Sequence, residues 1–243
     1  MRTDAWRAPA YLEQEYARAL KKVSRNISEY LIGAADTETD PAVFLRVADQ
    51  YAKLIEPWAN ALVARIGGSL WRRNEKTWVS LANEMGLETR QLVEGREVGD
   101  VLRFWMSSQI PLIKSIPTEA AERVHSIAMQ SIYTGQRSSE LTAALMDTQG
   151  VSEARARLIA RTETARAQTT FTQARAEQLG SEGYIWRTAN DHDVRTSHKE
   201  MDGKFVRWDH MPTLSDGTKC HAGGIYNCRC WPEPVLTDQP KLK

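Results

Sequence analysis

From residue 10 to residue 180, apolar residues recur every three or four positions with few interruptions. This spacing places them along one face of an α-helix, and it restricts the possible folds more than any other feature of the chain. The pattern is clearest over 11–32 and 41–66, which carry leucine, isoleucine and aromatic residues on one face. The sequence therefore predicts a mainly α protein.

Glycine and proline residues divide this helical part into segments. Pro57 predicts a kink or a break within 41–66, and Gly67-Gly68 predicts an interruption before a helix over 69–85. Pro117 is expected to open a helix because proline fits the first helical turn. Further helices are predicted over 97–114, 117–135, 138–146 and 151–179.

The longest predicted helix covers 151–179 and is rich in alanine and arginine, both good helix formers. Gly150 is expected to end the helix before it, Ser152 to cap its start, and Gly180 to end it. Arginines on such a helix usually form a solvated face, so they do not by themselves indicate a binding site.

The pattern changes after Gly180. Residues 184–188 and 204–208 are predicted to be short strands, with a turn at Asp202-Gly203 and irregular loops from residue 209 onward. The expected fold is mainly α: a helical N-terminal region followed by a small α+β module with short strands and irregular loops. The last stretch, 237–243, is expected to be a loose tail.

Composition limits the range of functions. Hydrophobic residues make up 42% and charged residues 26% of the chain, as in ordinary globular proteins. No apolar run reaches the roughly 18 residues that span a bilayer, and the N-terminal residues lack the apolar stretch of a secretory signal. The formal net charge is +1, which disfavours DNA binding through bulk charge but leaves room for a local basic face.

Three cysteines lie close together near the C-terminal end, at positions 220, 228 and 230. An odd number does not suit a disulfide framework, whereas clustered thiols with histidines nearby suit zinc. We therefore predict a structural zinc site among His198, Cys220, His221, Cys228 and Cys230. The C-x-C pair departs from standard zinc spacings, and the alternative is three reduced thiols beside surface histidines.

Catalysis has weaker support in the sequence. His192, His198 and the nearby carboxylates of Asp191, Asp193 and Glu200 suggest acid–base or metal-assisted hydrolysis, but such residues also occur together in polar loops. None of the common nucleophile, metalloprotease or phosphate-loop motifs is present. We expect no enzyme activity.

A set of short motifs in the second half of the chain resembles the phage Mu protein F-like domain of tailed-phage head morphogenesis and minor head proteins. The resemblance covers about residues 130–236. It implies a C-terminal domain over 131–236, preceded by a helical, partner-docking region over 1–130. The motifs, in chain order, are Ile159-Ala160-Arg161-Thr162-Glu163, Trp186-Arg187-Thr188, Asp193-Val194-Arg195, His198, Met201-Asp202-Gly203 and Asn227-Cys228-Arg229-Cys230, with Pro232 and Pro234-Val235 after them.

The resemblance implies a structural virion component that binds the portal vertex inside the procapsid, made in the host cytoplasm and acting in head assembly and DNA delivery. The implied partners are the portal protein, the major capsid or scaffolding protein and, transiently, DNA, with no membrane. Two other functions remain as alternatives: a metal-dependent nuclease or toxin-like hydrolase carried by the C-terminal module, and a zinc-stapled DNA-binding module.

This sequence departs from the family pattern in two places near the predicted ligands. Thr196-Ser197 stand where many family sequences have a cysteine or Pro-Ser, so a second cysteine pair is absent. No proline follows His221, which leaves open whether Cys220 or His221 would bind the metal.

Charged residues within these motifs have expected structural roles. Asp193 and Arg195 are predicted to pair and fix the turn before His198. Arg161 and Glu163 are two apart on a helix, so one is expected to contact the C-terminal module and the other a partner. Arg229 is expected to point away from the metal.

Overall fold

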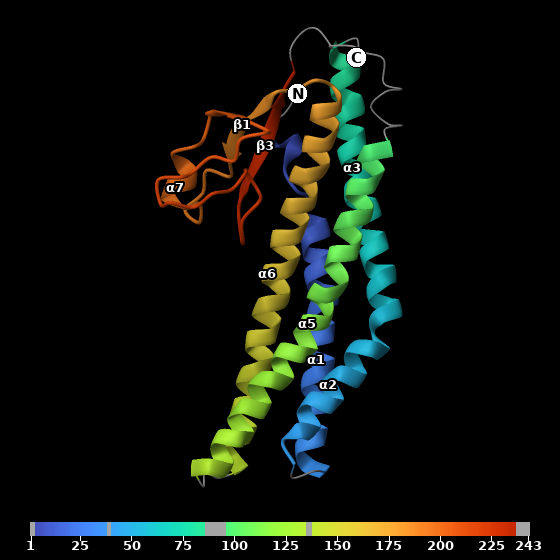
Figure 1. Ribbon diagram of the computed structural model, residues 1–243, viewed down its shortest axis with the longest axis vertical. Helices are drawn as coiled ribbons and strands as arrows, with labels where there is room; N and C mark the ends of the chain where they lie inside the picture. The colour runs from blue at the N-terminus through green and yellow to red at the C-terminus, as the bar shows by residue number, and fades with distance from the viewer. Residues whose placement is uncertain (1–2, 38–39, 86–95, 135–137, 237–243) are drawn as a thin grey trace. The chain divides into compact units, whose positions relative to one another are not determined.

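The computed structural model describes residues 3–37, 40–85, 96–134 and 138–236 (Figure 1). The elements, in chain order, are the 3-10 helix η1 (Thr3–Trp6), helices α1 (Ala10–Thr37), α2 (Ala42–Leu54), α3 (Glu56–Met85), α5 (Arg96–Thr134) and α6 (Ser138–Gln178), strand β1 (Gly183–Thr188), helix α7 (Thr196–Lys199) and strands β2 (Phe205–Arg207) and β3 (Cys230–Val235). Long helices followed by a small antiparallel sheet confirm the predicted fold class.

The chain divides into two compact units. One comprises Met1–Glu13, Arg65–Met106 and Arg161–Lys243, and the other Gln14–Ala64 and Ser107–Ala160. The predicted division into 1–130 and 131–236 stays a prediction, and the predicted tail at 237–243 lies outside the described residues.

The second unit is built from helices, and their apolar faces form its core. On α1 the buried residues follow the predicted spacing of three and four. The tyrosine of that face, Tyr16, also donates a hydrogen bond of 3.2 Å from its hydroxyl to the buried side chain of Gln109 on α5. Buried residues of this core include Tyr16, Leu20, Val23, Ile27, Leu31, Phe44, Ile113, Ile116 and Val124.

The first unit combines helix segments with the sheet. Strand β1 is central and pairs antiparallel with β2 on one side and β3 on the other. The tryptophan Trp6 of η1 packs edge-on against Trp78 of α3, with ring centroids 4.8 Å apart. The aromatic members of this core are Trp6, Trp78, Tyr184, Trp186, Trp208 and Trp231, and the three cysteines belong to the same cluster.

Several predicted helix boundaries are wrong. Gly67-Gly68 lies inside α3 and does not interrupt it. A Cβ on Gly67 would come within 2.8 Å of the Trp105 ring, so glycine here allows the helix to pack closely against Trp105. Pro111 and Pro117 lie inside α5, where the hydroxyls of Ser115 and Thr118 donate to nearby backbone carbonyls. In α6, Gly150 and Ser152 are both interior, so the helices predicted over 138–146 and 151–179 are one.

Other signals for helix ends are confirmed. The predicted break in 41–66 occurs at Ile55, which leaves Pro57 in the first turn of α3. Gly180 has a φ of 77° and follows the end of α6, where the backbone N–H groups of Ser181 and Gly180 donate to the carbonyls of Ala176 and Glu177. This is a Schellman arrangement, which favours glycine at the left-handed position.

Strand β3 and helix α7 were not predicted. β3 contains Pro232 and Pro234, and prolines argue against a strand because they lack a backbone N–H. They are tolerated here because β3 is an edge strand of the sheet. The predicted strands at 184–188 and 204–208 correspond to β1 and β2. In the described part of the chain, none of the helices has the length and apolar character that a membrane crossing requires.

Candidate metal centre

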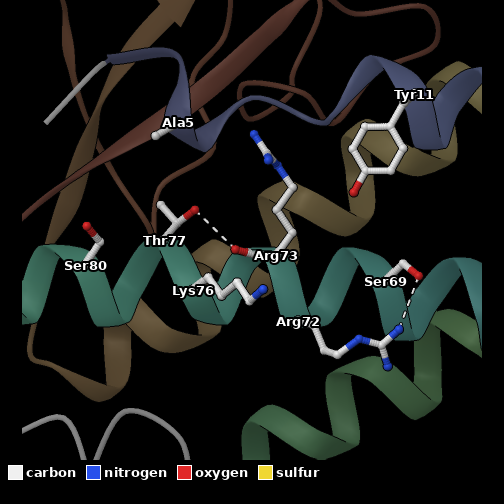
Figure 2. Close-up of a pocket in the computed structure, with 8 residues that line it drawn as sticks. All are labelled: Ala5, Tyr11, Ser69, Arg72, Arg73, Lys76, Thr77 and Ser80. Atoms are coloured by element: carbon white, nitrogen blue, oxygen red, sulfur yellow. Dashed lines mark hydrogen bonds between the residues drawn. The ribbon is translucent and has the colours of Figure 1, made fainter.

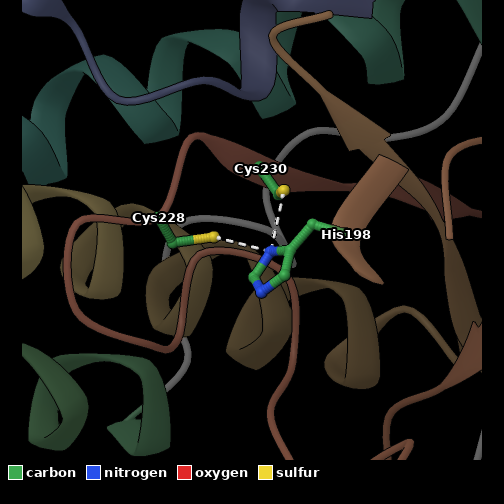
Figure 3. Close-up of side chains that lie close together, drawn as sticks. All are labelled: His198, Cys228 and Cys230. Atoms are coloured by element: carbon green, nitrogen blue, oxygen red, sulfur yellow. Dashed lines mark hydrogen bonds between the residues drawn. The ribbon is translucent and has the colours of Figure 1, made fainter. Parts of the chain in front are cut away.

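The structure brings three of the five predicted ligands together. The Nδ1 atom of His198 lies 3.3 Å from the Sγ of Cys230 and 3.5 Å from the Sγ of Cys228 (Figure 3). The three ligand atoms all lie within 4.8 Å of one another, and all three residues are buried. We call His198, Cys228 and Cys230 the His-Cys-Cys group.

Each member of the group comes from a different local structure. His198 is on the short helix α7, Cys230 is the first residue of β3, and Cys228 lies in the turn before it. Helix α7 is fixed from one side by Ser197, whose hydroxyl donates to the carboxylate of Asp216 over 2.7 Å. That bond and a backbone N–H from Thr218 lower the pKa of Asp216 to about 2, so the carboxylate stays charged and keeps accepting.

Helix α6 holds the turn that carries Cys228. The hydroxyl of Thr162 accepts a hydrogen bond of 3.1 Å from the backbone N–H of Asn227, and Arg161 donates to the Asn227 side chain over 2.9 Å. Asn227 has a φ of 56°, a left-handed conformation that asparagine tolerates better than most residues. Two of the family-like motifs are therefore in direct contact: the one on α6 positions the one that carries the cysteines.

The loop after Cys220 is also anchored on α6, where Thr169 donates to the carbonyl of Ala222 over 2.9 Å and Arg166 to that of Gly224 over 2.9 Å. Gly223 has a φ of 80°, and a Cβ there would lie 2.4 Å from the Thr169 hydroxyl and 3.2 Å from the Cys230 carbonyl. Only glycine satisfies both constraints, so the loop lies tightly between α6 and the start of β3.

The remaining two predicted ligands differ in their surroundings. Cys220 is buried in the same core cluster as Cys228 and Cys230, but it is not a member of the His-Cys-Cys group. The Nδ1 atom of His221 lies 3.1 Å from the hydroxyl of Tyr184, so this ring faces Tyr184. Burial lowers the pKa of His221 and raises that of Cys220 to about 11, which keeps both neutral near pH 7 without a metal.

The thiols of Cys228 and Cys230 titrate as a pair. The pKa of Cys228 is lowered because the Cys230 thiol and His198 hydrogen-bond its thiolate, while the pKa of Cys230 is raised by the same partner and by burial. The Trp186 ring meets the His198 ring edge-on, with centroids 5.5 Å apart. The group therefore stabilises one thiolate in a buried site beside an aromatic side chain.

The predicted roles of the charged motif residues are confirmed in part. The Asp193–Arg195 pair is wrong: Asp193 pairs with Arg229 over 2.5 Å, and Arg195 donates to the carbonyl of Tyr226. Arg229 also pairs with Asp191 over 2.7 Å, which directs its side chain to the two carboxylates.

Of the two charged residues on α6, Arg161 contacts the C-terminal module through Asn227, as expected. Glu163 does not face outward toward a partner. It is buried and pairs with Arg166 over 2.8 Å, next to the loop that Arg166 anchors. Both motif residues thus stabilise the module itself.

Comparisons with known proteins agree with the motif resemblance. Residues 122–232 match the family model described as phage Mu protein F like protein. An uncharacterized protein of Haemophilus influenzae is 29% identical over 204 residues, which cover 82% of this chain and 44% of the relative. The minor head protein GP7 of Bacillus phage SPP1 is 28% identical over 189 residues, which cover 64% of this chain and 61% of the relative.

The chain thus spans about half of the first relative and somewhat more of the second. No solved structure matches the chain significantly. The matched segment starts in the last part of α5, contains all of α6 and the His-Cys-Cys group, and ends within β3. Over residues 122–232, the chain is similar to the phage Mu protein F-like family.

Proposed function

We propose that this protein is a structural component of a tailed-phage head that acts in head assembly at the portal vertex, inside the procapsid. The observation that carries the proposal is the family match over residues 122–232, together with the similarity to the minor head protein GP7. The motifs behind the match stabilise one another in the folded chain, as the bonds from Arg161 and Thr162 to Asn227 show. Such a role needs a stable module more than a reactive one.

The His-Cys-Cys group supports a structural role over the hydrolase alternative. A catalytic metal site keeps a coordination position open to substrate and has a carboxylate nearby. The group here consists of an imidazole and two thiols with no carboxylate among its members, and its residues are only 2–5% exposed. A substrate would have little access to it.

The helical unit offers apolar residues for a partner. In that unit, Trp58 is 38% exposed and Leu54, four residues before it, is 70% exposed. Exposed tryptophans are frequent anchors of protein interfaces. We therefore place the contact with the portal, or with another capsid-assembly protein, on the face of residues 14–64 that carries Trp58.

Co-sedimentation of the full chain with portal rings at rising salt tests the proposal. The complex is expected to survive a few hundred millimolar salt, because an apolar contact is not screened by ions. Co-sedimentation with capsid or scaffolding protein in place of the portal would identify a different partner and would still support the role in head assembly. Absence of binding to any of these head proteins would contradict the proposal.

A second candidate function, contact with DNA phosphates, is favoured by one feature of α3. A cavity of about 520 Å³ lies over this helix and is lined by Arg72, Arg73 and Lys76 (Figure 2). The described residues that line it include these three cations and no acid. Phosphate oxygens are well matched to such a site, since arginine forks bind them in pairs. This is a local basic face on a chain with a net charge of only +1.

Replacing Arg72 and Lys76 together by alanine is expected to weaken binding to double-stranded DNA of any sequence. If both side chains contact phosphates, the slope of log affinity against log salt should fall by about two. The matched control is the Arg46→Ala/Lys53→Ala pair, which removes the same charge from exposed positions on α2. Filter binding across a salt series measures both. If both double variants lost the same DNA affinity, only the net charge of the chain would matter. That result would argue against this cavity as a DNA-binding site.

A further inference from the structure

We propose that His198, Cys228, Cys230 and Cys220 bind one zinc ion in a closed, tetrahedral, structural site. The proposal rests on the arrangement of these side chains and is independent of the head-assembly function proposed above. Its first support is that three side chains meet at one point (Figure 3). The imidazole nitrogen comes from α7, and the two sulfurs come from β3 and the turn before β3. These residues are up to 32 positions apart in sequence.

The two nitrogen–sulfur distances within the His-Cys-Cys group are close to those that zinc would impose. With Zn–N near 2.0–2.1 Å and Zn–S near 2.3 Å, tetrahedral angles place nitrogen and sulfur about 3.6 Å apart. The observed Nδ1–Sγ distances are 3.3 and 3.5 Å. An ion could therefore lie between these atoms with little rearrangement of the backbone. Both sulfurs approach the same nitrogen, so Nδ1 would be the ligand and the ring proton would lie on Nε2.

A structural zinc site requires a fourth protein ligand, and Cys220 is better placed than His221. Cys220 lies in the same core cluster as the other two cysteines. The residues just after it, Ala222 to Gly224, are held on α6 and beside the Cys230 carbonyl. His221 instead faces the Tyr184 hydroxyl. Metal binding would draw the Cys220 side chain into the group and leave the hydrogen bond of His221 intact.

The region that the ion would join has little regular structure to hold it. Between β2 and β3, residues 208–229 form turns and a single isolated bridge between Thr213 and Lys219. Four ligands would connect α7, the Cys220 loop, the Cys228 turn and β3 at one point. A metal contributes binding free energy to folding in such loop-rich modules, which would otherwise depend on a small apolar core.

Elemental analysis of the full chain, purified without chelator, tests the proposal first. About one zinc per chain is expected in the wild type. His198→Ala, Cys228→Ser and Cys230→Ser should each reduce the zinc content to below roughly a tenth of that. The matched controls are His192→Ala, which removes an exposed histidine between β1 and α7, and His221→Ala. Both should retain the full zinc content. Circular dichroism establishes that each variant is folded.

Cobalt substitution identifies the fourth ligand. Cobalt(II) in place of zinc gives near-ultraviolet absorption from each bound thiolate and visible bands typical of tetrahedral geometry. Three thiolates are expected in the wild type, so Cys220→Ser should lower the near-ultraviolet absorption by about a third, whereas His221→Ala should leave it unchanged. An unchanged spectrum in Cys220→Ser would exclude Cys220 and overturn the closed four-ligand site. A folded wild-type chain that binds neither zinc nor cobalt would overturn the metal site altogether, whatever the outcome of portal binding.

Discussion

Replacing Asn74 by leucine is expected to lower the free energy of unfolding by about 3–5 kcal/mol. The reason is the guanidinium of Arg175, which is buried at 1% exposure on α6. Its Nη1 donates to the side-chain oxygen of Asn74, and its Cζ lies 4.0 Å from the ring centroid of Trp71. Burial lowers the pKa of Arg175 to about 10 against the opposing effect of Glu75, which reflects how strongly the charge is desolvated. Leucine would remove the acceptor and leave that charge without its hydrogen bond.

Two further variants separate this effect from simple loss of a hydrogen bond. Asn74 also donates to the Thr172 hydroxyl over 2.8 Å, so Thr172→Val removes a neutral bond in the same place and should cost only about 1 kcal/mol. The double variant Asn74→Leu/Arg175→Met removes both partners and should recover most of the lost stability. Urea denaturation measures all three. If Asn74→Leu costs no more than Thr172→Val, the buried charge is not what makes Asn74 important.

The helices were predictable because the spacing of apolar residues is a local property of the sequence. Their ends were predictable only where local chemistry decides them, as at Gly180 and near Pro57. At Gly67 the helix continues because it packs against Trp105, a residue distant in sequence. The missing Cβ of Gly67 allows this close packing inside a continuous helix. Nothing in the residues around Gly67 indicates that contact.

The sheet was predicted in part for a similar reason. Two strands carry a recognisable alternation, but β3 contains two prolines, and its place at the edge of the sheet makes them acceptable. Edge position follows from the pairing of all three strands. It cannot be inferred from the composition of one strand alone.

The candidate ligands were found from residue type and clustering, and the structure brings together His198, Cys228 and Cys230. The side chains that position them were missed. Thr162 and Arg161 lie more than sixty residues before Asn227, and their bonds to it depend on how the chain folds back along α6. The shared order of the short motifs was the one available signal, because it indicates which residues function together.

Replacing Trp78 by alanine is expected to lower the free energy of unfolding by about 3–5 kcal/mol, a change as large as that for Asn74. Trp78 is 1% exposed and belongs to the same apolar cluster as the sheet residues and the three cysteines. It also meets Trp6 edge-on at 4.8 Å, a contact that adds to the effect of burial. Alanine would leave a cavity among large rigid side chains that cannot easily collapse into it.

Trp58→Ala is the matched control, since it removes the same side chain from the same helix, α3, at a position that is 38% exposed. This replacement should lower the free energy of unfolding by about 1 kcal/mol or less. It should also weaken co-sedimentation with the portal ring. Trp78→Ala should affect co-sedimentation only through loss of folded protein. Far-ultraviolet circular dichroism follows unfolding in both variants, because tryptophan fluorescence would itself change. Equal destabilisation by the two replacements would mean that Trp58 also belongs to a core, and the proposed docking face would then lose its anchor.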